Sequence, residues 1–176
     1  IEECFGSGQH IVVCDDNIVW LQALADGFEF RPLRRSPAEL SSLFLRADAE
    51  MARRGAFLWG ISPTQNPFFI RGFLNSKHSK DQDGASCKLG LIYGAFFGFI
   101  ARHDPALYTQ FGQVKDDVER TLRFWDRDRI VLRFFEYACA KRHRPGKFDA
   151  KKGGISKGLG EDGHHREAQA ALRQIA

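Results

Sequence analysis

A short apolar run that ends in acidic residues constrains the fold of this chain more than any other feature. Residues 11–14 read Ile-Val-Val-Cys, and Asp15, Asp16 and Asn17 follow directly. A β-branched run of this length predicts a short buried strand. Ligands of open α/β sheets bind at the carboxyl ends of the strands, where paired carboxylates can hold a hard divalent cation. The alternative is a strand followed by an Asp/Asn-rich turn.

Helix signals recur along the rest of the chain. Residues 36–39 form a capping box with proline at the first helical position, which predicts a helix that runs to Arg54. Gly55 can supply its left-handed cap. The apolar residues of this helix recur at helical spacing and predict one buried face: Leu40, Leu43, Phe44 and Ala47.

A second helix is predicted to begin at Asp116 or Asp117. We expect Asp116 to cap it, because Glu119 follows three residues later and repeats the capping pattern. The apolar residues expected on one face of this helix are Val118, Leu122 and Trp125. A short terminal helix is predicted over residues 164–175.

Strand signals alternate with these helices. Strands are predicted over residues 57–61, 68–71 and 130–140, and a strand or a strand pair over residues 88–101. In residues 88–101, Gly94 and Gly98 are expected to mark kinks or close backbone approaches. Residues 143–163 are rich in glycine and charge and are expected to form a mobile loop. The alternation predicts an α/β fold in a single domain over residues 1–176.

Composition and cysteine usage exclude several classes of protein. The chain is 43% apolar and 27% charged, which is ordinary for a globular protein. It contains no apolar run of about 18 residues, so no membrane span is expected. The four cysteines are widely spaced and form no CxxC pair, so neither a zinc site nor a disulfide framework is implied. A reducing intracellular compartment, cytoplasmic or nuclear, fits this pattern.

The charge of the chain is unevenly distributed. Residues 1–70 carry 6 Lys/Arg and 9 Asp/Glu, whereas residues 71–176 carry 20 and 13. A basic second half beside an acidic pocket suits a polyanionic acceptor such as nucleic acid. A solvated basic surface is the alternative.

Six further segments belong to one ordered set. They are GAFLWGI at 55–61, NPFFIR at 66–71, LIYGAFFG at 91–98, KDDVERTLRF at 115–124, VLRF at 131–134 and KGGI at 152–155. In this order and spacing they resemble the TET/JBP-associated glycosyltransferases. The resemblance spans roughly residues 8–166 and is specific as a set, although no single motif would suffice.

The resemblance implies a GT-A-like mixed sheet flanked by helices. It also implies transfer of a sugar from a nucleotide-sugar donor to a hydroxyl of a hydroxymethylated pyrimidine in DNA. A GT-A domain opens with a nucleotide-binding half before its acidic motif. Few residues precede Asp15 here, so we expect this chain to lack that half.

Residues for the donor follow from the resemblance and from their chemistry. Asp15 and Asp16 are expected to bind Mg²⁺ or Mn²⁺ and, through it, the leaving diphosphate. Asn17 stands where the family pattern has a third acid, and an amide oxygen is a weaker, neutral ligand. A loop that closes over the donor phosphates is expected at Lys152, Gly153 and Gly154, where a flexible linker is the alternative. The candidates for a third metal ligand are His143, His164 and His165, for which a surface position is the alternative.

Residues for the acceptor lie in other segments. Asp117 is the candidate base that removes the proton of the acceptor hydroxyl, with Asp116 beside it, although both can be structural at a helix start. The candidates for binding the acceptor are Trp59, Asn66, Lys115 and Arg133. An indole can stack on a sugar or a flipped base, and Asn can read a base edge. The alternatives are an ordinary strand aromatic and an Asn-Pro turn.

Two other functions remain open from the sequence. The chain can be a glycosyltransferase with a glycan or a lipid-linked acceptor. It can also be a non-catalytic nucleic-acid-binding remnant, which Asn17 and the expected loss of the donor half favour. The basic second half favours DNA as the acceptor.

Overall fold

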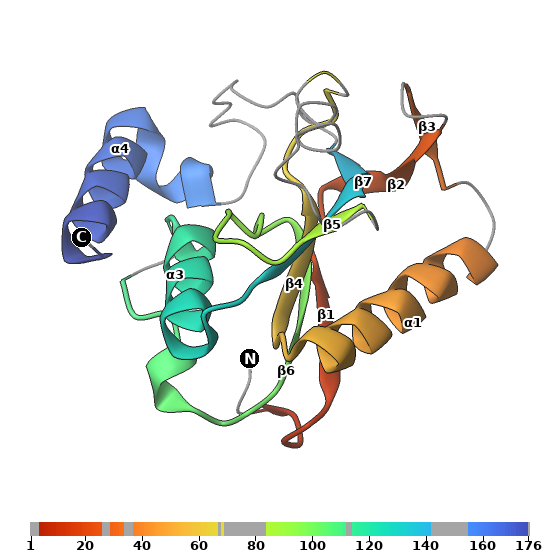
Figure 1. The fold of residues 1–176 in the computed structure, drawn as a ribbon. Coiled ribbons are helices and arrows are strands. Elements are labelled where there is room, and N and C mark those ends of the chain that lie inside the picture. The colour runs from red at the N-terminus through yellow and green to blue at the C-terminus, as the bar shows by residue number, and fades with distance from the viewer. Residues whose placement is uncertain are drawn as a thin grey trace.

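A computed structural model describes residues 4–25, 29–33, 37–66, 68, 84–111, 114–141 and 155–175. These residues form a mixed α/β fold with a seven-stranded mixed sheet and three α-helices (Figure 1). The α/β class predicted from the sequence is therefore confirmed. No helix in the described part of the chain is long and apolar enough to cross a bilayer.

The sheet contains one long strand and several short ones. Its strands are β1 (His10–Cys14), β2 (Ile18–Ala25), β3 (Glu29–Pro32), β4 (Leu58–Ser62), β5 (Ala85–Ser86), β6 (Phe96–Ile100) and β7 (Leu132–Lys141). The helices are α1 (Pro37–Arg54), α3 (Asp116–Asp128) and α4 (Ile155–Ile175), and a 3-10 turn, η2, covers Pro105–Leu107.

Strand directions bring three strand ends together. The order in the sheet is β1-β6-β4-β7-β2-β3, with β5 paired to β7. The β4–β7 pair is parallel, and β6 is antiparallel to both β1 and β4. The strands β1, β4 and β7 therefore run the same way. Their last residues, Cys14, Ser62 and Lys141, define what we call the carboxyl end of the sheet.

The first strand differs from its prediction in burial. β1 forms as expected, but it lies at the edge of the sheet, and none of its five residues is fully buried. It pairs with β6 in the described structure, and apolar runs of this length do not by themselves distinguish an edge strand from a central one.

The core has one apolar cluster on each face of the sheet. In Figure 1, α1 and α3 lie on opposite sides of the strands. Leu43, Ala47 and Met51 of α1 pack against one face, and Phe124 of α3 packs against the other. Alternate residues of β4 serve the two clusters, as the period of a strand requires.

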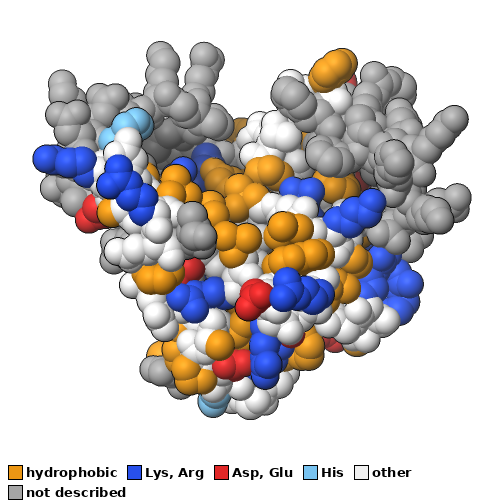
Figure 2. Space-filling view, turned by 60° about the vertical axis from the view of Figure 1, so that its left-hand side comes forward, with side chains coloured by type: hydrophobic (Ala, Val, Ile, Leu, Met, Phe, Trp, Pro, Cys, Tyr) orange, Lys and Arg blue, Asp and Glu red, His pale blue; other side chains and the backbone are white. Residues whose placement is uncertain are grey.

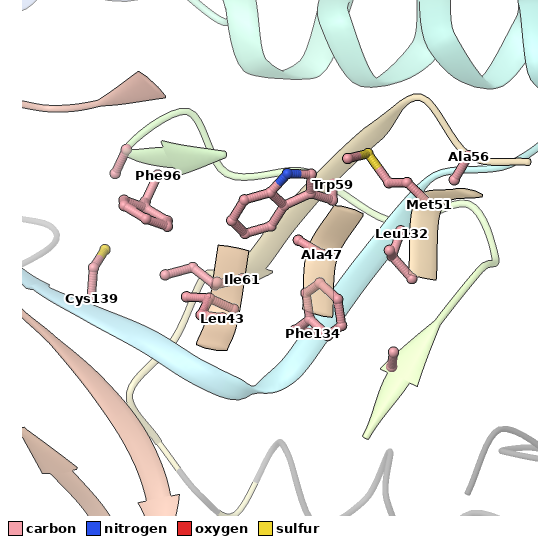
Figure 3. Packing of buried hydrophobic residues seen from close by; sticks show 12 residues of the cluster. Leu43, Ala47, Met51, Ala56, Trp59, Ile61, Phe96, Leu132, Phe134 and Cys139 are labelled. Atoms are coloured by element: carbon pink, nitrogen blue, oxygen red, sulfur yellow. The ribbon is translucent and has the colours of Figure 1, made fainter. Parts of the chain in front are cut away.

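Trp59 is central to the cluster beneath α1. Its side chain is completely buried, and its ring meets Phe96 and Phe134 edge-on at centroid distances of 5.9 Å (Figure 3). Its Nε1 donates a hydrogen bond of 2.7 Å to His10 Nε2. A Cβ on Gly98 would lie 2.6 Å from Trp59 Cε2, so the predicted close approach at this glycine is confirmed. Trp59 is therefore a core residue, and its prediction as an acceptor-binding residue is wrong.

Helix α1 matches its predicted end and most of its predicted face. It ends at Arg54, and Gly55 has a φ of +69°, as expected for a left-handed cap. Leu43 and Ala47 are fully buried, whereas Leu40 is 36% exposed and was wrongly assigned to the core. Ser36 of the capping box lies outside the described residues.

Helix α3 begins at Asp116 as predicted, but its cap is different. Lys115 is the N-cap, with a φ of +70° and no capping hydrogen bond from its side chain. Asp116 pairs with Arg120 instead, so its prediction as the cap is wrong. Glu119 turns inward and accepts hydrogen bonds from the backbone N–H groups of Gln110 and Phe111 at 2.7 and 3.0 Å.

The buried face of α3 also differs from the apolar pattern. Its fully buried residues are Glu119, Thr121 and Phe124. The three apolar residues predicted to face the core are only partly buried: Val118, Leu122 and Trp125. The carboxylate of Glu119 can be buried in their place because it has hydrogen-bond partners. It accepts from two backbone N–H groups and from the guanidinium of Arg123.

The remaining elements match their predictions in part. β4 and β7 confirm the strands predicted over 57–61 and 130–140, while only residues 96–100 of the 88–101 run form a strand. In the strand predicted over 68–71, Phe68 is helical, and residues 69–71 lie outside the described structure. Residues 155–163, predicted as loop, instead begin α4. The rest of that predicted loop, with His143, Lys152, Gly153 and Gly154, lies outside the described residues.

Candidate functional site at the carboxyl end of the sheet

An ion pair joins two strand ends at the carboxyl end of the sheet. Asp15 follows β1 and Lys141 is the last residue of β7, and Lys141 Nζ lies 2.8 Å from Asp15 Oδ2. The chain turns after Asp15 so that Ile18 pairs with Lys141, which brings the two side chains together. Asp15 is 44% exposed, and pairs this exposed contribute only about 0.2–1 kcal/mol to stability. The pair therefore contributes little to stability, and its main effect is to fix two charged groups at the carboxyl end of the sheet.

Tyr93 completes the surroundings of the lysine. Lys141 Nζ lies 4.8 Å from the centre of the Tyr93 ring. Burial alone would lower the pKa of Lys141, but the neighbouring Asp15 and Tyr93 side chains outweigh burial and raise this pKa above its usual value. The ammonium group is consequently charged throughout the physiological pH range.

Residues 93–95 connect the two acidic segments that the sequence singled out. The backbone N–H of Asp15 donates to the carbonyl of Ala95 at 2.8 Å. A Cβ on Gly94 would lie only 3.2 Å from the Cβ of Asp117. Asp15 and Asp117, which are far apart in the sequence, therefore both lie against the same short segment.

Thr121 fixes the position of the first turn of α3. Its hydroxyl donates to the carbonyl of Asp117 at 2.7 Å and accepts the N–H of Ile92 at 3.0 Å. Since Ile92 immediately precedes residues 93–95, this buried threonine holds Asp117 against them. A polar residue on the inner face of α3 thus serves the geometry of the site.

The two acidic residues of α3 have different surroundings. Asp117 Oδ1 accepts the N–H of Val118 at 2.9 Å, and within the described structure Oδ2 accepts no hydrogen bond. Asp116 pairs with Arg120, whose guanidinium lies 3.9 Å from the centre of the Phe97 ring. Asp117 is therefore the residue with a carboxylate oxygen available to a ligand, whereas Asp116 belongs to a surface ion pair.

The residues present do not fit the divalent cation that the resemblance implies. Mg²⁺ and Mn²⁺ prefer about six oxygen ligands, several of them anionic. Here the carboxylate of Asp15 is paired with Lys141, and Asn17 is neutral with an enclosed Oδ1 that has no partner in the described structure. Asp16 is exposed. No group of three or more His, Cys, Asp or Glu side chains within the described residues could hold a metal ion.

The other predicted acceptor residues lie in different places. Asn66 is exposed, and its Oδ1 accepts the N–H of Phe68 at 3.0 Å, which makes it the turn residue of the alternative interpretation. Its neighbour Gln65 donates to the carbonyl of Cys139 at 2.7 Å and so holds this turn against the last part of β7. Lys115 is exposed at the start of α3, two residues before Asp117.

Arg133 lies at the wrong end of the sheet for a role in this site. It is the second residue of β7, and its guanidinium lies 4.8 Å from the centre of the Phe135 ring and packs against Gly90. Burial lowers its pKa. Lys141 is eight residues further along the same strand, which corresponds to about 26 Å. Arg133 is therefore not brought together with Asp15 and Asp117.

Two cysteines lie close to the ion pair. Cys139 is buried on β7, as expected of a small apolar thiol, whereas Cys14 on the edge strand is exposed. Burial is the largest cause that raises the pKa of each thiol, and the charge of Asp15 raises both further. Both thiols are therefore protonated near neutral pH and are poor nucleophiles.

Sequence reasoning missed the lysine at this site. Lys141 directly follows the strand predicted over residues 130–140, and a charged residue at the end of a buried strand is the signal that could have identified it. Tyr93 is not among the site residues predicted from the sequence, although it lies in the segment at 91–98. The strand order, which the sequence does not give, decides that the ends of β1 and β7 meet.

No protein-family model, curated protein or solved structure matches this chain. The function proposed below therefore depends on the resemblance of the ordered motifs and on the contacts of this site.

Proposed function

We propose that this chain is a glycosyltransferase domain that moves a sugar from a nucleotide-sugar donor to a hydroxyl of a hydroxymethylated pyrimidine in DNA. One observation carries the proposal: Asp15 and Asp117, the key residues of the two acidic motifs in the resemblance, both lie against residues 93–95. A transferase needs a group near the leaving diphosphate and a base near the acceptor, held in one geometry.

The two sides of the site suit different substrates. The Asp15–Lys141 pair supplies fixed charge at the carboxyl end of the sheet, where ligands of α/β folds bind. Asp117 offers a carboxylate at a helix start, with one oxygen that accepts no hydrogen bond in the described structure, and a carboxylate can accept the proton of a hydroxyl. Donor and acceptor would therefore meet above residues 93–95.

The choice of DNA as acceptor depends on charge. Figure 2 shows a face where Lys and Arg are more prominent than Asp and Glu. Many of the arginines that follow residue 100 nevertheless form ion pairs, among them Arg102 with Asp128 and Arg127 with Asp104. Residues 142–154, which lie outside the described structure, contain five Lys/Arg and one Asp. The net positive charge of the second half favours a polyanionic acceptor.

The test is a transfer assay on hydroxymethylated duplex DNA with a panel of nucleotide sugars. After digestion, mass spectrometry should detect a hexosylated hydroxymethylpyrimidine, and Asp117→Asn should abolish most of it. Asp126→Asn is the matched control, because Asp126 is 81% exposed in the last turns of the same helix. A product on a glycan acceptor but not on DNA would favour the second transferase function. DNA binding without any transfer would favour the non-catalytic remnant.

A further inference from the structure

Lys141 lies where the resemblance implies a divalent cation beside Asp15. The positive charge that faces the diphosphate can therefore come from a lysine and not from a metal ion. A divalent cation would require the carboxylate of Asp15, but Lys141 Nζ already lies 2.8 Å from its Oδ2. Asn17, in the place of a third acid, offers only a neutral oxygen that is enclosed. A cation at this position would have to displace a lysine that two strands and a tyrosine hold in place.

Lys141 has the chemistry to bind phosphate. An ammonium group has three N–H donors, and in the described structure Lys141 donates one of them, to Asp15 Oδ2. Its side chain is 20% exposed, so the charge is shielded from bulk water but accessible to a ligand. Lysine binds phosphates as a point charge, and such charge-assisted hydrogen bonds are the strong ones.

We propose that Lys141 binds the diphosphate of the donor and that this site holds a nucleoside diphosphate without a divalent cation. The inference rests on the proposed function and specifies its donor side. When the bond between the anomeric carbon and the diphosphate oxygen breaks, its electron pair stays on that oxygen, next to the Lys141 ammonium. The acceptor oxygen forms the new bond to the anomeric carbon, and its proton passes to the carboxylate of Asp117.

The role of Asp15 changes accordingly. It becomes a positioning residue that orients the ammonium group, together with Tyr93, rather than a metal ligand. Replacing Asp15 by Asn should therefore weaken diphosphate binding less than replacing Lys141, because an amide oxygen can still accept the lysine hydrogen bond. A metal ligand would show the opposite order.

The experiment is calorimetric titration with UDP, GDP and ADP, each in EDTA and in Mn²⁺. We expect the wild-type affinity for the preferred nucleotide to agree within about twofold between EDTA and Mn²⁺. Lys141→Met should weaken binding about tenfold or more, as expected for a charge-assisted hydrogen bond, and Lys141→Arg should restore part of it. The exposed Lys88 provides the matched control, Lys88→Met, which should leave binding unchanged.

The outcomes separate this inference from the proposed function. Binding that requires Mn²⁺ and is unaffected by Lys141→Met would overturn the role of Lys141 and leave a metal-dependent transferase. Absence of binding by all three nucleotides in both conditions would overturn both proposals. Melting temperatures show whether each variant folds. If Lys141→Met does not fold, the wild-type affinities in EDTA and in Mn²⁺ still decide whether nucleotide binding needs a divalent cation.

Discussion

The core around Trp59 and the carboxyl end of the sheet differ in how their polar groups are partnered and exposed. The Trp59 ring is fully buried, and its one polar atom donates a hydrogen bond to His10. At the carboxyl end, charged groups of Asp15, Asp117 and Lys141 stay partly exposed, and Asp117 keeps an oxygen without a partner in the described structure. The proposed function therefore assigns stability and chemistry to separate groups of residues, which mutations can distinguish.

The largest effect is expected at Asp117. Asp117→Asn keeps the shape of the side chain but removes the proton acceptor, so turnover should fall by about 10²–10⁴, the usual share of general acid–base catalysis. The melting temperature should change little, because the amide oxygen can still accept the N–H of Val118. Rates and melting curves on the same preparation check this. Undiminished turnover would remove Asp117 from the mechanism, and loss of folding would make it structural.

Trp59 provides the converse case. Trp59→Ala leaves a cavity beneath α1 and removes the hydrogen bond to His10, so the free energy of unfolding should fall by about 3–5 kcal/mol. Chemical denaturation measures this loss. Nucleotide binding by the fraction that remains folded should be unchanged, because the ring is inaccessible. A variant that is stable but cannot bind its acceptor would return Trp59 to the site.

Gly98 tests the closeness of the packing in the same core. In Gly98→Ala the new Cβ would lie 2.6 Å from Trp59 Cε2 and 2.9 Å from the carbonyl oxygen of Ile11. Overpacking of this kind should cost about 1–3 kcal/mol of stability. Gly6→Ala is the control, because its Cβ would meet only the side chain of Gln9, at 3.5 Å. Equal denaturation midpoints for the two variants would show that the indole does not approach this strand so closely.

The smallest effect is a pH dependence of stability at His10. Burial lowers the pKa of His10, against a weaker opposing effect of Asp48, and the ring must stay neutral at Nε2 to accept from Trp59. The unfolded chain therefore takes up a proton more readily. This contribution to stability is complete above about pH 6.5 and is lost as the pH falls below that value. His10→Gln keeps an acceptor that does not titrate, so its melting temperature should fall less between pH 8 and 5.5. Parallel melting curves of the two proteins would contradict this.

The comparison also explains which features could be predicted from the sequence. Three features were predicted correctly from local sequence signals, each with one physical cause. They are the end of α1 at Gly55, the start of α3 at Asp116 and the close backbone approach at Gly98. Residues were misassigned where long-range partners decide. Glu119 is buried because backbone donors from residues 110 and 111 reach it, and the sequence gives no sign of them.

The same limit applies to the candidate site. Asp15 and Asp117 were identified from local patterns, but their common neighbour, residues 93–95, depends on strand order. Arg133 and Lys141 belong to one strand, and only its direction in the sheet separates the residue outside the site from the residue within it. Sequence patterns therefore supplied candidates, and topology selected among them.

The most direct test of the central claim is an NMR titration of the isotopically labelled protein with UDP, GDP and ADP in EDTA. If the carboxyl end of the sheet binds the donor, the backbone amides that shift should cluster at residues 14–18, 93–95, 117 and 141. Amides of residues 131–135, at the amino end of β7, should stay in place and serve as the internal reference. Shifts centred on residues 131–135, or no shifts with all three nucleotides, would contradict the account.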